Sequence, residues 1–207
     1  MSGAEWLAFV GIWFLASIPL GPNAINCILV TARFGIRFMT WPIIGIAIAS
    51  VIFQTLVFLG IATLLTTAAG LFTVVKLLGC AYLAWLGIKL WRSEATPIDE
   101  QEIPAPSPLA MIRSGYLISL SNPKAILAYA AVFTQFIDPQ TSILSQAAVL
   151  TPTALAVLVT VYASYALAGA PVRQFLTNAR RVKAVNRTAS SFFILSAAAI
   201  ATAEARR

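Results

Sequence analysis

The chain has 207 residues, of which 59% are hydrophobic and only 10% are charged, and its mean hydropathy is +0.86. This composition is too apolar for a soluble globular domain and is typical of a protein that lies largely within a lipid bilayer. The formal net charge of +7 does not indicate nucleic-acid binding, because most of the basic residues fall between apolar segments, as they do in membrane proteins.

Six apolar segments are close to the length, about 20 residues, at which a helix crosses a bilayer. We therefore expect an all-α integral membrane protein with six transmembrane helices, at residues 6–31, 39–65, 69–91, 109–137, 146–170 and 188–204. The first segment is not expected to be a cleaved signal peptide. It is preceded by Glu5 and by no Lys or Arg, and its apolar run is longer than that of a signal peptide.

Basic residues concentrate in the loops expected after the first, third and fifth segments. The loops after the second and fourth segments contain no Lys or Arg. Because loops rich in Lys and Arg stay in the cytosol, this pattern predicts that both termini lie outside, and it also favours contact with anionic lipid headgroups. The ten basic residues on the predicted cytosolic side are Arg33, Arg37, Lys89, Arg92, Arg113, Arg173, Arg180, Arg181, Lys183 and Arg187.

Residues 93–108 are the only segment with the composition of a linker. They include four prolines and four acidic residues, so they bury too little apolar surface to fold alone. The segment divides the chain into 1–92 and 109–207, each with three predicted helices. Because three is an odd number, the second unit enters the membrane upside down relative to the first. The sequence therefore predicts two inverted three-helix repeats, an arrangement found in many secondary transporters.

Two short polar motifs interrupt apolar segments at corresponding places in the two units. Gly21-Pro22-Asn23 interrupts the first predicted helix and Asn122-Pro123-Lys124 interrupts the fourth. Proline breaks a helix, and in hydrocarbon such a break is tolerated only where protein or a water-filled cavity satisfies the freed backbone groups. Paired breaks of this kind are the best pointer in a sequence to a transporter's binding site.

Each motif is also a good start for a new helix. Gly21 and Asn122 are suitable N-caps, and proline is favoured at the position that follows. The two helix starts would then present free N–H groups and partial positive charge near the membrane centre, which suits a carboxylate. The alternative is that both breaks are packing kinks without a ligand.

Two lysines lie inside predicted helices. A charge at the bilayer centre costs about 3 kcal/mol on insertion scales, so such residues usually face a cavity or a polar partner. Lys124 lies near the middle of its helix, whereas Lys76 is nearer an end and could extend to the headgroups instead. The predicted substrate site comprises Gly21, Pro22, Asn23, Asn26, Lys76, Asn122, Pro123 and Lys124.

Other polar residues within the predicted helices could line a cavity as a set, although each alone is better explained by a hydrogen bond between helices. They are Asn26, Ser50, Gln54, Thr55, Tyr129, Gln135, Thr160, Tyr162, Ser164 and Tyr165. The chain has no His, and no Asp or Glu lies deep in a predicted helix. No catalytic or metal-binding spacing is present. We therefore expect neither an enzyme nor a metal or other cofactor.

Several further residues are expected to serve packing and anchoring. Trp6, Trp13, Trp41 and Trp91 lie near predicted helix ends and are interpreted as interfacial anchors. Gly45 with Ala49, and Gly115 with Ser119, are small residues four apart that allow close helix packing.

The two cysteines, Cys27 and Cys80, lie in different predicted helices and are interpreted as small packing residues. Their alternative role is a membrane thiol–disulfide electron conductor, which requires the two thiols to meet. A non-transporting membrane accessory protein is a further alternative to a transporter.

The motifs together resemble one bacterial family. Gly21-Pro22-Asn23, residues 76–87 (KLLGCAYLAWLG), Asn122-Pro123-Lys124-Ala125 and the following Phe136-Ile137-Asp138-Pro139 are similar to the LysE/RhtB-type amino-acid exporters. The resemblance covers most of the chain, from the first helix to about residue 140. It implies a multi-pass inner-membrane protein with periplasmic termini that exports amino acids or close derivatives, driven by protons. The partners implied are a small-molecule substrate, membrane lipids and a possible second copy in a homodimer.

The chain departs from the family pattern at two places. Family members carry proline where this chain has Leu20, and many carry an acid in the second helix where it has Ala49-Ser50. Asn23 and Ser50 thus stand where a carboxylate could be. The candidates for coupling are Lys124, since a lysine removed from water releases its proton more readily, and Asp138. Efflux down a gradient without ion coupling is the third possibility.

Overall fold

The computed structural model describes residues 1–60, 69–94, 104–138, 140–175 and 178–202, and within these ranges the chain forms helices and no strand. The predicted linker 93–108 and the predicted helix 39–65 therefore lie partly outside the described residues. The elements are α1 Gly3–Ser17, α2 Pro22–Phe34, the short 3-10 helix η1 Ile36–Phe38, α3 Thr40–Phe58, α5 Ala69–Trp91, α6 Pro108–Leu120, α7 Pro123–Phe133, α8 Ile143–Phe175 and α9 Ala179–Thr202.

The all-helical character expected from the sequence is confirmed for the described residues. Among the described residues, two helical stretches could each cross a membrane by length and composition, Ile36–Phe58 and Ile143–Val172. The pair α1 and α2 would form a third, bent span. The arrangement of six spans in inverted repeats stays a prediction.

Helix α1 ends at Ser17, and α2 begins at Pro22 with its axis turned by 69°. Pro19 and Pro22 have no N–H to donate to a preceding turn, so neither residue can continue the hydrogen-bond ladder of α1. Gly21 caps α2 in an extended conformation, and its carbonyl accepts a hydrogen bond from the N–H of Ile25 at 3.1 Å. The first predicted break is confirmed at the predicted residue.

The second break has the same form. Helix α6 ends at Leu120, and α7 begins at Pro123. The carbonyl of Asn122 accepts hydrogen bonds from the N–H groups of Ala125 and Ile126, at 2.9 and 3.3 Å. Asn122 therefore stands at the cap of α7, as the sequence predicts.

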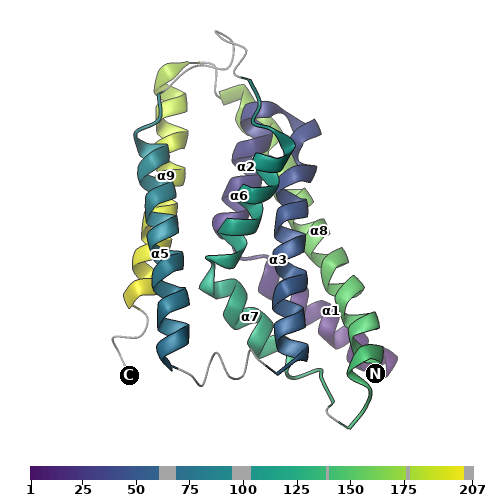
Figure 1. The fold of residues 1–207 in the computed structure, drawn as a ribbon. Helices are drawn as coiled ribbons and strands as arrows, with labels where there is room; N and C mark the ends of the chain where they lie inside the picture. Colours follow the sequence, from purple (N-terminus) through teal and green to yellow (C-terminus); the bar gives the residue numbers. More distant parts are fainter. Residues whose placement is uncertain (61–68, 95–103, 139, 176–177, 203–207) are drawn as a thin grey trace.

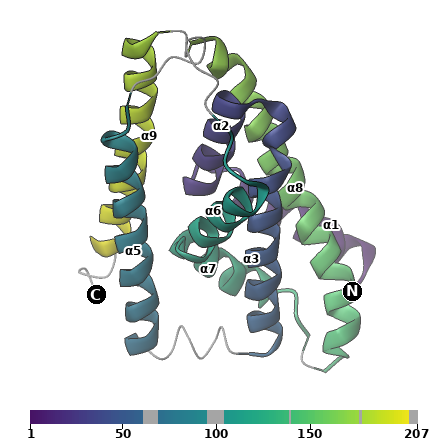
Figure 2. The ribbon, with the colours of Figure 1, turned by 45° about the horizontal axis from the view of Figure 1, so that its top comes forward.

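The helices form two groups (Figure 1). Helices α5 and α9 pack along each other on one side, while α1, α2, α3, α6, α7 and α8 form the other group. Figures 1 and 2 show that α2, α5 and α8 end, and α3, α6 and α9 begin, at one end of the molecule. We call this the basic end, because Arg33, Arg37, Lys89, Arg92 and Arg113 lie in or beside these helix termini. The N-terminus lies at the opposite end.

The structure corrects the start of the last helix. Helix α9 begins at Ala179 rather than at residue 188, so Arg180, Arg181, Lys183 and Arg187 lie in a helix and not in a loop. The side chain of Asn178 accepts a hydrogen bond from the N–H of Arg181 at 2.9 Å and so caps this start. The first turns of α9 were missed because they are amphipathic: their apolar face packs inward while the four basic side chains are exposed.

Glycines bring two helices of the larger group into backbone contact. A Cβ atom on Gly45 in α3 would lie 2.0 Å from the carbonyl oxygen of Ile112, and one on Gly115 in α6 would lie 2.2 Å from that of Pro42. Residues with larger side chains could not occupy these positions without moving the helices apart. The close packing predicted from the small residues four apart is confirmed for this pair of helices.

We therefore expect Gly115→Ala to destabilise the folded protein by about 1–3 kcal/mol or more, since the new methyl group would meet backbone atoms that have no room to move. The thermal midpoint of the purified protein in detergent is the measurement. Gly11→Ala on α1 is the matched control, because a Cβ there would meet nothing within 4 Å. Equal midpoints for the two variants would contradict the tight α3–α6 contact.

Candidate functional site

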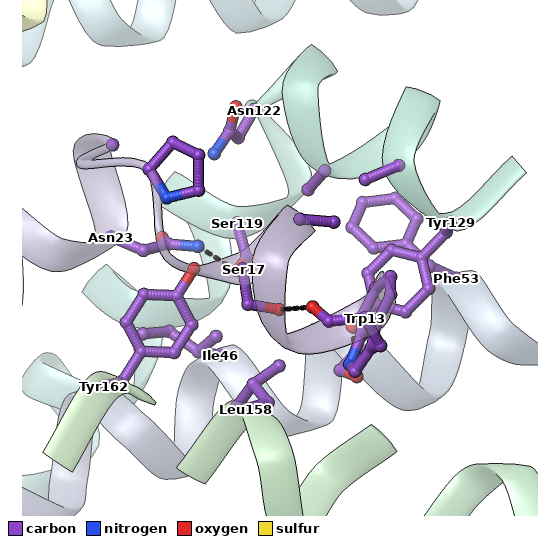
Figure 3. Close-up of a pocket in the computed structure, with 16 residues that line it drawn as sticks. Trp13, Ser17, Asn23, Ile46, Phe53, Ser119, Asn122, Tyr129, Leu158 and Tyr162 are labelled. Atoms are coloured by element: carbon purple, nitrogen blue, oxygen red, sulfur yellow. Dashed lines mark hydrogen bonds between the residues drawn. The ribbon is translucent and has the colours of Figure 1, made fainter. Parts of the chain in front are cut away.

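A cavity lies where the two helix breaks meet (Figure 3). Its volume is about 40 Å³, enough for a few water molecules. Gly21 and Asn23 line it from the start of α2, and Asn122 and Ala125 line it from the start of α7. The remaining lining residues are Trp13, Ala16, Ser17, Pro19, Ile46, Ser50, Phe53, Ser119, Ala128, Tyr129, Leu158 and Tyr162.

A hydrogen bond joins the two broken helices at this cavity. The Nδ2 atom of Asn23 donates to Oγ of Ser119 at 2.8 Å, and both side chains are buried. The other end of the same amide, Oδ1 of Asn23, is buried and has no hydrogen-bond partner in the described part of the chain. A buried acceptor without a partner is costly, which makes this oxygen available to a ligand or a water molecule.

A second polar group comes from α3 and α7. Nε2 of Gln54 donates to Oγ of Ser50 at 2.9 Å, and Oγ of Ser50 shares a hydrogen bond with the hydroxyl of Tyr129. All three side chains are at most 5% exposed, and Oε1 of Gln54 has no described hydrogen-bond partner. Ser50 and Tyr129 line the cavity, while Gln54 lies behind them. Buried polar groups of this kind orient one another and fix the cavity wall.

Aromatic rings form the apolar wall. The ring centroid of Tyr129 lies 4.6 Å from that of Trp13 and 5.3 Å from that of Phe53. The indole N–H of Trp13 donates to the carbonyl of Ala154 in α8 at 3.2 Å, which fixes the orientation of its ring. Figure 3 shows these three rings gathered on one side of the cavity and Asn23, Ser119 and Asn122 on another.

Trp13 corrects a sequence-based interpretation. It is not an interfacial anchor, since it is only 3% exposed and lies in the core beside the cavity. The interpretation placed residue 13 toward one end of the first apolar segment and did not take the predicted break at Pro22 into account. Trp13 lies nine positions before Pro22, where the helix breaks. This short distance is the signal that could have placed Trp13 near the cavity at the break.

Seven of the ten polar residues noted in the sequence fall into two kinds. Ser50, Tyr129 and Tyr162 line the cavity, as expected of a set that forms a polar lining. Thr55, Gln135, Thr160 and Ser164 instead donate to carbonyl groups of their own helices, four residues earlier, so their polarity is satisfied locally.

The predicted site residues are only partly brought together. Gly21, Asn23 and Asn122 line the cavity, and Pro22 is buried beside it. Asn26 does not line it; its Oδ1 accepts from the Ser114 hydroxyl at 3.4 Å on the side toward the basic end. The side chains of Lys76, Pro123 and Lys124 lie outside the described part of the structure.

The coupling candidate Asp138 lies away from the central cavity. It follows α7 in the connection to α8 at the end opposite the basic end, and its side chain is exposed. Its Oδ1 accepts from the N–H of Gln140 at 2.9 Å, and its own N–H donates to Oε1 of Gln146 at 2.8 Å. These contacts shape the connection between the two helices.

The chemistry of the described lining residues is that of neutral polar groups and aromatic rings. The described residues hold no group of three His, Cys, Asp or Glu side chains placed to bind a metal. Cys27 is fully buried against Ile43, Ile46 and Leu158, which is the packing role expected of it, while the side chain of Cys80 lies outside the described part. What the cavity offers is two helix starts, neutral amide and hydroxyl groups, and an aromatic wall.

Comparison with known proteins identifies the relatives of this chain. The family model for the LysE type translocator matches residues 14–204. A homoserine/homoserine lactone efflux protein of Salmonella typhimurium is 32% identical over 96% of this chain and 96% of its own length. A leucine efflux protein of Enterobacter sp. is 30% identical over 95% of this chain and 94% of its length.

A membrane protein of Vibrio cholerae whose function is uncharacterised is 32% identical over 97% of this chain and 98% of its own length. No solved structure shows a significant match to the chain. The family resemblance inferred from the motifs is confirmed by these matches.

The hydrogen bonds behind the cavity wall lead to a stability prediction. Ser50→Ala leaves the buried Gln54 amide without its partner and should cost about 1–3 kcal/mol. The thermal midpoint in detergent is the measurement, and Ser164→Ala is the control, because that hydroxyl bonds only its own helix. Adding Gln54→Leu to Ser50→Ala should recover part of the loss, since it removes the orphaned amide. A double variant that is less stable still would contradict this account.

Proposed function

Since the chain belongs to the LysE type translocator family, we propose that it exports a neutral amino acid, or a close derivative of one, across the bacterial inner membrane. The observation that carries the proposal is the central cavity, because both helix starts, Asn23 and the aromatic wall meet there. Two half-helices that begin at a shared cavity provide N–H donors where the membrane itself provides none.

The roles of the cavity residues follow from the chemistry of an amino acid. The substrate carboxylate is held by the helix starts at Pro22 and Pro123 and by Lys124. The unpartnered Oδ1 of Asn23 accepts a hydrogen bond from the substrate ammonium group. The side chain of the substrate packs against the wall formed by Trp13, Phe53 and Tyr129.

A neutral cargo is supported by the lining of the cavity. No Asp or Glu is among the described lining residues, so a lysine or arginine side chain would find no carboxylate there. The relatives named for the efflux of leucine, and of homoserine and its lactone, support the same class of cargo. Apolar and small polar side chains both suit a wall of aromatic rings beside hydroxyl groups.

Loading requires a more open conformation than this one. A cavity of about 40 Å³ holds a few waters, which is less than an amino acid needs. Two close helix crossings lie between the cavity and the basic end. Helix α3 crosses α6 at Gly45 and Gly115. Helix α2 crosses α8 where a Cβ on Gly169 would lie 2.5 Å from the carbonyl oxygen of Ile28. We take the two broken helices to belong to inverted repeats that rock about the cavity, separating these crossings when substrate enters from the cytosol.

Efflux from cells preloaded with labelled leucine, homoserine or lysine tests this function. The parent chain should export leucine or homoserine and not lysine. Lys124→Ala and Asn23→Leu should lower that export at least about tenfold, since a buried substrate charge or polar group without its partner costs more than about 1.4 kcal/mol. Thr160→Val is the matched control, because its exposed hydroxyl bonds only its own helix.

Three outcomes would contradict parts of this proposal, provided that each variant reaches the membrane in equal amount. Unchanged export by Lys124→Ala would show that the side chain of Lys124 does not hold the substrate. Export of lysine alone would overturn the neutral cargo. Export of none of the three by the parent would overturn the proposed function and favour a non-transporting accessory role.

Proton coupling through Lys124 gives a separate prediction. Arginine keeps the positive charge and does not release its proton in proteins, so Lys124→Arg should bind and exchange substrate but fail to drive uphill transport. The measurement is substrate accumulation in proteoliposomes with and without a pH gradient. Asp138→Asn, in the exposed connection, should retain accumulation. If Asp138→Asn loses accumulation and Lys124→Arg keeps it, proton coupling belongs to Asp138. If accumulation by the parent does not depend on the pH gradient, transport is not coupled to protons.

A further inference from the structure

A second cavity lies between the two groups of helices near the basic end. Its volume is about 230 Å³, and its lining comes from α2, α5 and α9 and shares no described residue with the central cavity. One wall is apolar and includes Leu29, Val30, Leu86, Leu90 and Phe193. Except for Phe193, these side chains are only partly buried, so the protein leaves apolar surface available along this wall.

Arg33 is held at the polar part of this cavity. Its guanidinium donates to Oδ1 of Asn186 in α9, and Nδ2 of Asn186 donates to Oγ of Ser93 at 2.9 Å. Asn186 is 3% exposed, so the contact that positions the guanidinium is well shielded from water. A guanidinium keeps its charge under all ordinary conditions and presents several donors in a geometry that matches phosphate oxygens.

Lys89 brings a second positive charge to the same cavity. It lies in the last turn of α5, and its Nζ is 5.1 Å from the ring centroid of Trp85. Trp85 is exposed, and an exposed tryptophan beside a lysine at a helix end is typical of the headgroup region of a bilayer. The cavity thus combines two cationic groups at headgroup level with an apolar wall that runs along the helices.

We propose that this cavity binds one anionic phospholipid of the surrounding membrane. Its phosphate contacts Arg33 and Lys89, and its acyl part lies along the wall formed by Leu29, Val30, Leu86, Leu90 and Phe193. Basic pockets between transmembrane helices on the cytosolic side suit anionic headgroups, and the other basic residues of this end attract the same lipids from the leaflet. A small soluble anion would use the two charges but leave the apolar wall in contact with water, which favours a lipid.

The proposal does not rest on the exported cargo, because the site shares no described residue with the central cavity. Its position does have a consequence for the fold. The lipid would lie between the α5–α9 pair and α2, which is where the two groups of helices have few direct contacts (Figure 2).

The test is the thermal midpoint of the purified full-length protein in neutral detergent with added phosphatidylglycerol or phosphatidylcholine. A ligand that binds only the folded state raises the midpoint, so phosphatidylglycerol should raise it by at least about 3 °C and phosphatidylcholine should not. Lys89→Gln and Arg33→Gln should each remove at least half of the shift.

Two further variants keep the test decisive, since Arg33→Gln also breaks the bond to Asn186. Val30→Trp fills the cavity while it leaves every charge in place, and it should also remove at least half of the shift. The double variant Arg180→Gln and Arg181→Gln is the matched control: it removes two exposed charges from the same end that do not line the cavity, and it should keep the shift.

Three results would overturn the lipid site. Loss of the shift in the control variant would mean that the whole basic end attracts the lipid without a site. An equal shift with phosphatidylcholine would mean that the headgroup charge is not recognised. An equal shift with inorganic phosphate would mean that the cavity takes a small soluble anion. The readout is stability and not export, so none of these results depends on the proposed function.

Discussion

The structure depends on one constraint: backbone groups freed by a helix break have no water to bond inside a bilayer. Helix breaks at Pro22 and Pro123 free backbone groups that need polar partners, and residues from both helix starts line one cavity. The side-chain hydrogen bond from Asn23 to Ser119 joins a residue at the start of α2 to one near the end of α6. Polar side chains from the two breaks thus lie beside one another.

The same arrangement produces the candidate binding site. Enclosing polar groups from α2, α3, α6 and α7 leaves the acceptors Asn23 Oδ1 and Gln54 Oε1 without described partners. A core selected for stability alone would satisfy or remove such groups, since each costs about 1–3 kcal/mol. The Asn23 acceptor lines the cavity, and a cavity that must bind and release a small polar molecule requires such a group, so this acceptor supports the transport function that we propose.

Close packing around the cavity is uneven. Glycines bring α3 against α6 and α2 against α8 on the side toward the basic end, whereas the α5–α9 pair touches the other helices at few places. Small residues at these crossings allow the helix backbones to approach closely, which holds the larger group together on that side. The sparse contacts around α5 and α9 leave room for the lipid that we propose at Arg33 and Lys89.

The sequence by itself determined the membrane class, the helical fold, the family and both helix breaks, because hydropathy and proline act locally on the chain. It also pointed to Gly21, Asn23 and Asn122, since these residues belong to the breaks. Only the tertiary structure decided that Trp13 lines the cavity rather than the interface and that Asn26 faces elsewhere. These outcomes depend on the 69° turn after α1 and on which helix faces meet, and neither is encoded in the local pattern of any one segment.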